Sequence, residues 1–562
     1  MRGARLGGPW HVFYHTVKKC GVIMKMRSCA NNVVTCSILA ITFAACGPGG
    51  ADNTEGARVT TLADVVDASD GETSLREAID YALENSVAVD FESSLTGAIV
   101  LSNGAIALDG SGALTIDGEG RITIDAGAKS RVFEGNGPDL ELRGLTLLGG
   151  IAESSSEGGG AIYMKAGALA LIDCTLRDNK HLSDIGSGGA VHVAEGASLR
   201  AERSTFENNT ARREGGAIHT ATLDEVTLTA CDFSGNGPDD PSSSLWGASI
   251  HHTGGDLTIE QSTFEDETSD RGALYITTDV GKVRVEESTF ANNTSNMGAA
   301  IYFQYDGASQ EIDAVSLEVT DTTFEGNSAA TSGGAISAHE YTRVVLNEVT
   351  MTGNKATADG ASGGGIATSG GLVLSGGSFE GNSAAAQGGL LYSTGLNNKS
   401  YIEVASGDFS GNSANDGGVM WVSFANRIEI SGATFAGNRS ETSAGALSLL
   451  GEQTSITGAT FTDNIAMDET SRGGAIYTSG DITLSATTFS GNKAGFGGAI
   501  YALTADVTLD AEVSLSGNAA TVDAGVLNAG GAICNDDGDV SLGGASVTGN
   551  SPDDFCSPER VM

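Results

Sequence analysis

The chain has 562 residues, of which 80 are glycine and 7 are proline. Glycine is about twice as frequent as in ordinary proteins, yet the low proline count and the lack of a strict three-residue glycine period exclude collagen. Hydrophobic residues make up 40% of the chain, which excludes a disordered polyanion. The net charge of −41 argues against nucleic acid as a partner, because phosphate is repelled.

Residues 1–45 have the composition of a signal peptide. They contain six basic residues and no acidic residue, whereas all 71 acidic residues lie beyond them. A short basic region precedes an apolar stretch over 33–45, which has the length of a signal-peptide core. Residues 1–23 are superfluous for such a signal, so we expect synthesis to start at Met24 or Met26.

The apolar stretch ends in Phe-Ala-Ala-Cys at 43–46, which resembles a bacterial lipoprotein signal. The resemblance implies that Cys46 is lipidated and that its acyl chains hold the protein on a membrane. An ordinary secretory signal that is cut nearby is the alternative. After the cleavage point, residues 46–57 are expected to carry the lipid and to form a flexible tether.

Residues 58–150 are predicted to form an N-terminal cap and irregular rungs. Ser74 and Glu77 match a capping box, and the apolar spacing after them predicts a helix over about 75–85. Such a helix would cover the open edge of the first rung. Short alternating segments follow at Ile106/Leu108, Leu114/Ile116, Ile122/Ile124 and Leu140/Leu142.

Residues 151–550 are predicted to be one regular array of repeats. Strings similar to Gly-Gly-Ala-Ile and Phe-x-x-Asn alternate through fourteen copies, with a mean period of about 28.5 residues. One column is aliphatic in every copy: Ile162, Val191, Ile218, Ile250, Leu274, Ile301, Ile336, Ile366, Leu391, Met420, Leu447, Ile476, Ile500 and Ile533. A second column holds ten phenylalanines: Phe206, Phe233, Phe264, Phe290, Phe324, Phe379, Phe409, Phe435, Phe461 and Phe489.

An asparagine column lies three residues after the second column. Only Glu267 departs from it among the fourteen copies. The thirteen members are Asn179, Asn209, Asn236, Asn293, Asn327, Asn354, Asn382, Asn412, Asn438, Asn464, Asn492, Asn518 and Asn550. We predict a structural ladder of amides, in which each side chain bonds to the one on the next rung.

Each copy offers about three short strands with inward apolar positions, separated by glycine-rich corners. A unit of this size cannot bury its apolar face alone, but copies stacked at about 4.8 Å can. The phenylalanine column then becomes an internal stack. The pattern predicts an all-β, right-handed parallel β-helix (solenoid) of about 17 rungs with a short N-terminal capping helix.

The paired motifs, over about 158–550, resemble the repeats of polymorphic outer membrane proteins, which have a pectate-lyase-like right-handed β-helix fold. The resemblance implies a role in surface structure, adhesion or display. Members of that family usually end in a membrane β-barrel, whereas twelve residues, the tail at 551–562, follow Asn550. We therefore expect the lipid anchor to attach the chain to the outer membrane or cell surface.

Four cysteines lie in or beside the array. Cys174 and Cys231 occupy one column two rungs apart, or about 9.6 Å, whereas a disulfide needs Cα atoms within about 7 Å. They are predicted to be unpaired and packed against the core. Cys534 lies in the last rung and Cys556 in the tail, and an exported compartment permits a disulfide between them.

The residue after the aliphatic column is expected to point outward, because side chains alternate along a strand. Ten copies carry an aromatic residue or histidine there: Tyr163, His192, His219, His251, Tyr275, Tyr302, Tyr392, Trp421, Tyr477 and Tyr501. Three interpretations of this stripe stay open. It is a surface ladder that stabilises stacking, a binding surface for sugar rings, or a metal site on His192, His219 and His251.

The favoured function is non-enzymatic, with no catalytic residue, no metal site and no cofactor beyond weak binding of divalent cations, for example at the acidic turn 535–539. The alternatives are a polysaccharide lyase or glycosidase, which would need clustered carboxylates and a basic residue in a cleft, and a non-catalytic glycan-binding module. Expected partners are a membrane, through the lipid anchor, and a glycan or a cell-surface protein of a host or neighbouring cell. We expect a monomer.

Overall fold

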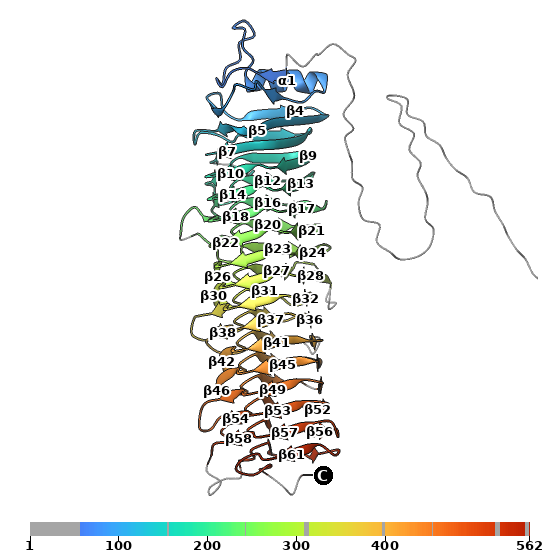
Figure 1. The fold of residues 1–562 in the computed structure, drawn as a ribbon. Coiled ribbons are helices and arrows are strands. Elements are labelled where there is room, and N and C mark those ends of the chain that lie inside the picture. The colour runs from blue at the N-terminus through green and yellow to red at the C-terminus, as the bar shows by residue number, and fades with distance from the viewer. Residues whose placement is uncertain are drawn as a thin grey trace, which may run out of the picture. The chain divides into compact units, whose positions relative to one another are not determined.

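The computed structural model describes residues 57–153, 157–241, 243–307, 314–395, 400–451, 453–522, 529–556 and 561. They belong to one compact unit, Asn53–Met562. This unit is a right-handed parallel β-solenoid of about 17 turns with one short helix, as the sequence predicts (Figure 1). The predicted signal peptide and Cys46 lie outside the described residues.

The predicted cap helix is confirmed as α1 (Leu75–Asn85), which lies at the N-terminal end of the stack (Figure 1). The Ser74 hydroxyl accepts the Glu77 N–H, and the Glu77 carboxylate accepts the Ser74 N–H at 2.8 Å. The helix buries Leu75, Ala78, Ile79 and Ala82. These apolar side chains cover the end of the core, where an open rung would otherwise meet water.

The first rungs are irregular, and their strands differ in length. They are β1 (Arg58–Val59), β2 (Asp90–Phe91), β3 (Gly97–Val100), β4 (Ile106–Asp109), β5 (Ala113–Asp125), β6 (Phe133–Asn136), β7 (Asp139–Leu148), β8 (Ile151–Ala152) and β9 (Ile162–Ile172). Strand β5 pairs in parallel with β7, and the register shifts between Asp117 and Ile122. These rungs contain the apolar pairs that the sequence singled out.

A regular rung has four short strands rather than about three. One rung consists of β23 (Leu274–Thr278), β24 (Lys282–Glu286), β25 (Thr289–Ala291) and β26 (Thr294–Met297). Its strands pair in parallel with β27 (Ile301–Tyr305), β28 (Val315–Thr320), β29 (Thr323–Glu325) and β30 (Ser328–Ser332) of the next rung. The fourth strand follows the ladder asparagine, where the segments of two to five residues are too short to show the alternation that predicts a strand.

The phenylalanine column forms an internal stack. From Phe206 to Phe324, neighbouring ring centroids lie 4.7–5.1 Å apart and the rings are within 8° of parallel. Met351 interrupts the column, and a second stack runs from Phe379 to Phe489 with spacings of 4.7–4.9 Å. The ring spacing matches the rung spacing, so each ring contributes to the core of two neighbouring rungs.

The asparagine column forms a buried ladder of hydrogen bonds beside this stack. The Oδ1 atom of Asn412 accepts the backbone N–H and the side-chain amide of Asn382, both at 3.0 Å. Its own amide donates to the carbonyl of Phe379 at 2.8 Å and to Oδ1 of Asn438 at 3.1 Å. Each amide is therefore satisfied by its own backbone surroundings and by the neighbouring rung.

A left-handed corner precedes every member of this ladder. The residue before each ladder position has a φ between 53° and 68°, and it is always glycine, asparagine or aspartate, as in Gly411 and Asn292. These are the residues that adopt a positive φ at least cost. The corner turns the chain sharply after the phenylalanine and directs the next side chain inward.

Glu267 takes the place of an asparagine in the ladder. Its side chain is 1% exposed, and one carboxyl oxygen accepts the Asn236 amide at 2.9 Å. Burial raises the pKa of this carboxyl to about 8, although hydrogen bonds from Asn236 and Ser249 oppose the shift. The group is therefore protonated in the folded chain at neutral pH.

Truncation of one ladder side chain should weaken the stack locally. Asn412→Ala is expected to cost about 3 kcal/mol, because two buried donors of Asn382 lose their acceptor. The measurement is thermal melting together with amide hydrogen exchange of the adjoining rungs, since solenoids open in segments. Asn415→Ala is the control, because Asn415 is exposed on the same rung. Equal effects of the two substitutions would contradict the ladder's role.

Glu267 should make the stability of the fold depend on pH. Its pKa is about 8 when folded and near the ordinary 4.5 when unfolded, so the folded state holds an extra proton between these values. The free energy of unfolding should then fall by about 1.4 kcal/mol per pH unit as pH rises through this window. Melting of the wild type and Glu267→Gln from pH 5 to 8 tests this. If Glu267 is ionised in the fold, the difference between the two proteins should instead stay constant from pH 5 to 8.

Candidate functional site

The aromatic and histidine stripe points away from the main core, but most of it is not exposed. Seven of the ten side chains are 2–9% exposed: Tyr163, His192, His219, His251, Tyr275, Tyr302 and Tyr501. Tyr392, Trp421 and Tyr477 are half-buried. The prediction of an outward, solvent-facing stripe is therefore wrong for seven members.

The stripe is covered by the residue that precedes the glycine-containing corner of each repeat, such as Gly215-Gly216 or Gly272-Ala273. This residue forms parallel bridges from rung to rung, for example Ser187 to Glu214, Glu214 to Trp246 and Trp246 to Arg271. The chain folds back there, and its side chains close over the stripe. Arg271 lies over the rings of Trp246, Tyr275 and Tyr302, with its guanidinium carbon 5.1–5.9 Å from their centroids. The alternation of side chains along the strand predicted that the stripe points away from the core. It did not predict the segment that covers the stripe.

The covered stripe is a continuous column of rings over six consecutive rungs. Its strands are β9 and β23, described above, with β12 (Val191–Val193), β16 (Ile218–Thr220), β20 (Ile250–Thr253) and β27. From Tyr163 through the three histidines to Tyr302, adjacent centroids lie 4.7–5.4 Å apart. Each ring between Tyr163 and Tyr302 therefore lies between two others.

Glu214, His219 and His251 form the most concentrated group of metal-ligating side chains among the described residues. One ligand atom from each lies within 4.8 Å of the other two. The Oε2 atom of Glu214 is 3.6 Å from Nε2 of His219 and 3.6 Å from Nδ1 of His251. The Ser187 hydroxyl donates to the same oxygen at 2.7 Å. His192 lies next to the group, and its Nδ1 is 3.1 Å from the Ser187 carbonyl.

Burial controls the ionisation of this group. It lowers the pKa of His192 to about 4 and holds the pKa of His219 well below its usual value. For Glu214, burial acts to raise the pKa, but His251, the Ser187 hydroxyl and Arg213 outweigh it and lower the pKa to about 2. At neutral pH an ionised Glu214 carboxylate therefore lies beside neutral imidazole rings at His192 and His219.

The three histidines are recognisable in the sequence as a possible metal site, whereas Glu214 was not predicted to belong to it. The carboxylate comes from the covering column rather than from the stripe, and it lies on the same rung as His219. The position of Glu214 in the repeat could have identified it, because Glu214 directly precedes Gly215-Gly216. A residue at that position packs over the residue that follows the aliphatic column.

Tyr392 and Trp421 remain candidates for a sugar-binding surface. They lie on β39 (Leu391–Thr394) and β43 (Met420–Ser423), which pair in parallel. Their ring centroids are 5.2 Å apart and the rings are inclined by 18°. This is a half-buried stacked pair rather than the ten-membered surface that the stripe suggested.

An open groove of about 490 Å³ on the outer face contains a basic residue among carboxylates. Arg427 pairs with Glu429 at 3.3 Å. Asp481 and Asp506 each accept a backbone N–H of the next rung at 2.9 Å, from Asp506 and Asp539 respectively. Both aspartates therefore bond to the neighbouring rung, and Arg427 also pairs with Glu403 of the preceding rung.

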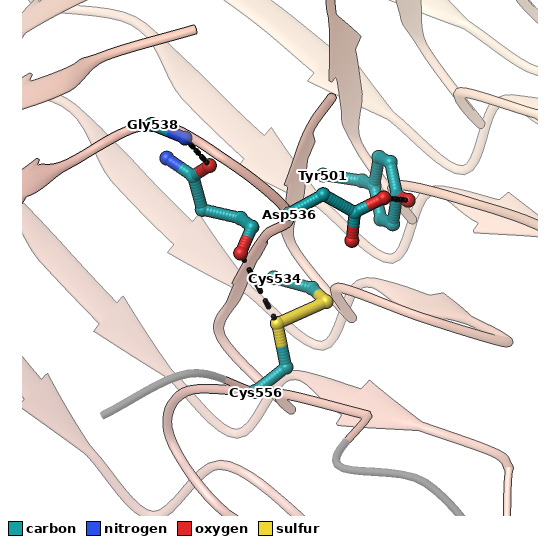
Figure 2. Close-up of a disulfide and its surroundings, with 6 residues drawn as sticks. Tyr501, Cys534, Asp536, Gly538 and Cys556 are labelled. Atoms are coloured by element: carbon teal, nitrogen blue, oxygen red, sulfur yellow. Dashed lines mark hydrogen bonds between the residues drawn. A yellow bond between two sulfur atoms is a disulfide. The ribbon is translucent and has the colours of Figure 1, made fainter. Parts of the chain in front are cut away.

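The last rung is closed by a disulfide between Cys534 and Cys556, whose Cα atoms are 4.9 Å apart (Figure 2). Beside it the Tyr501 hydroxyl bonds to the Asp536 carboxylate (Figure 2). The Asn535 side chain accepts the Gly538 N–H at 2.8 Å. The turn at 535–539 thus uses two of its polar side chains for structural bonds.

Cys174 and Cys231 are buried and unpaired. Burial raises the pKa of both thiols to about 11, so they are protonated and unreactive at neutral pH.

The architecture defines the chain as a right-handed parallel β-helix protein. Residues 160–312 match the family of right handed beta helix regions. Residues 321–339, 458–479 and 486–503 match the Chlamydia polymorphic membrane protein repeat. Over these three segments the chain is similar to the repeat of polymorphic membrane proteins. Neither a curated protein nor a solved structure matches the chain.

The described part of the chain contains no helix that is long and apolar enough to span a membrane. The predicted lipidation of Cys46 lies outside these residues.

The disulfide should stabilise the C-terminal edge. Closing a loop with a sequence separation of 22 is worth about 3 kcal/mol, mainly through the lost freedom of the unfolded chain. Dithiothreitol should therefore lower the stability of the last rung in the wild type, as measured by hydrogen exchange around Ile533. Cys556→Ser should start from the lower value and show no response to the reductant. A response of equal size in both proteins would trace the effect to other cysteines.

Proposed function

We propose that this chain is a surface-exposed β-helical rod with an adhesive or structural role, held on a membrane through lipidated Cys46. The observation that supports the proposal best is the continuity of the repeated columns. The aliphatic column runs in parallel register from Ile162 to Ile533 through fourteen rungs. Repetition of this kind produces long, stiff faces for presentation or attachment.

The net charge of the chain supports exposure of the solenoid surface to water. The net charge of −41 gives the exterior a strongly acidic character, which keeps neighbouring rods soluble and apart. Similarity to the polymorphic membrane protein repeat supports a place at the outer membrane or cell surface.

A non-catalytic glycan-binding module is the second candidate, and the Tyr392–Trp421 pair favours it. Two stacked rings on adjacent rungs offer an apolar face to a sugar ring. Phe424 lies three residues beyond Trp421 and is 64% exposed, which makes it a matched control for exposed aromatic surface.

The test of location uses intact cells that produce the full chain. Antibody labelling and external protease should reach the solenoid, and Cys46→Ala should release it from the membrane fraction. A chain that stays inaccessible in intact cells but becomes labelled after lysis would contradict a surface role.

The test of activity uses the purified full chain on a polysaccharide panel, with and without calcium. We expect attachment to cells without depolymerisation. Glycan retention that is lost in Trp421→Ala but kept in Phe424→Ala would establish the glycan-binding module. Shortened or unsaturated products would show a glycosidase or lyase and would overturn the non-enzymatic proposal.

A further inference from the structure

We infer that Glu214, His219 and His251 form a binding site for a divalent transition-metal ion that joins two neighbouring rungs. From the sequence, a metal site on His192, His219 and His251 was one open interpretation of the stripe, whereas the favoured function included no metal site. Glu214 and His219 belong to one rung, and His251 occupies the position paired with His219 on the next rung. The inference does not depend on the proposed surface function.

The spacing of the three ligand atoms suits a single ion. Two ligands bound at about 2.1 Å are about 3.0 Å apart at a right angle and about 3.4 Å apart at a tetrahedral angle. The Glu214 carboxylate oxygen is 3.6 Å from a nitrogen of each histidine. Small side-chain rotations would bring all three atoms to an ion placed between them. At 3.6 Å the same contacts are too long to be hydrogen bonds.

The histidine nitrogens lack other partners. Both nitrogens of His251 and Nδ1 of His219 are buried and have no hydrogen-bond partner. The His251 side chain is 4% exposed, and its Nδ1 is the atom that faces the Glu214 carboxylate. Buried polar atoms without partners are rare and costly, and a bound cation would satisfy this nitrogen.

The surroundings hold the ligands in place. The ring of His219 lies between His192 and His251, at centroid distances of 4.7 and 5.0 Å. Tyr275 lies on the other side of His251, at a centroid distance of 4.8 Å and an inclination of 51°, and the Trp246 ring is nearly perpendicular to the His251 ring at 6.5 Å. The rings therefore cannot turn away from the carboxylate without breaking the column. Such a rigid arrangement lowers the entropic cost of binding.

The carboxylate is oriented for one-oxygen coordination. Arg213 lies 3.2 Å from Oε1 of Glu214, and the Ser187 hydroxyl donates to Oε2. Oxygen Oε2 keeps a second lone pair for the ion. Supporting bonds of this type fix the direction of a metal ligand.

The donor set selects the class of metal. Two imidazole nitrogens and one carboxylate oxygen suit zinc and its first-row neighbours, with a further position for water. Calcium and magnesium require about six oxygen ligands, and this group offers a single carboxylate. The ion would link β16 to β20 and so resist the separation of two rungs.

Zinc binding by the purified full chain tests the site. Metal-stripped wild type, Glu214→Gln, His251→Gln and His339→Gln are titrated with Zn²⁺ by calorimetry, and bound zinc is counted after gel filtration. His339 is the control, because it contacts the same ring column through Tyr302 but lies away from Glu214. Circular dichroism and melting of each apoprotein verify the fold. Glu214→Gln preserves shape, so it decides the result if His251→Gln fails to fold.

The wild type and His339→Gln should each bind one more equivalent of zinc than Glu214→Gln and His251→Gln. A loss of affinity of at least tenfold in these two variants also supports the site. Excess Ca²⁺ should not displace the zinc. The inference fails if the wild type binds no zinc, or if all four proteins bind equal amounts with equal affinity, because the ion would then be held elsewhere in the chain.

Discussion

Exact register between neighbouring rungs is the constraint on which this structure depends. Side chains alternate along each strand, so a slip by one residue would move the core residues to the outside. The buried asparagine ladder opposes such a slip, because each side chain bonds to a backbone and a side-chain amide of the same column on the adjoining rung. The left-handed corner before each asparagine places that side chain inward at the same point of every turn.

Register also creates the outer cluster. His219 and His251 are neighbours because Ile218 pairs with Ile250, and this pairing places both rings in one column. Glu214 approaches them because the segment before the glycine pair folds back over the strand. The register that builds the core therefore also brings the ligand atoms of Glu214, His219 and His251 together on adjacent rungs. These atoms lie outside the core but are buried by the covering segment. In a solenoid, a chemically distinctive site can arise from ordinary repeats when a few columns carry the right residues.

Much of the fold could be predicted from local patterns. The cap helix follows from the capping box at Ser74 and Glu77, and the rungs follow from the recurrence of Phe-x-x-Asn. The fourth strand of a regular rung could not be predicted, because it spans only two to five residues, too few to show a clear alternation. For the outer site, the histidines were visible as consecutive members of one column. The burial of these histidines could not be predicted. Side-chain alternation along a strand indicates which way a side chain points, but it does not indicate whether another segment of the chain covers that side chain.

The sequence by itself determined the solenoid, its repeat length, its internal columns and the place of its cap, because these depend on period and residue type along the chain. It also indicated which cysteines could meet. Tertiary structure alone decided that Tyr275 and Tyr302 are covered by Arg271 and that Glu214 reaches His219 and His251. Those contacts depend on how the chain folds back over the strand at the glycine corner. They also depend on which residues of neighbouring rungs lie next to each other, because the rungs differ in length.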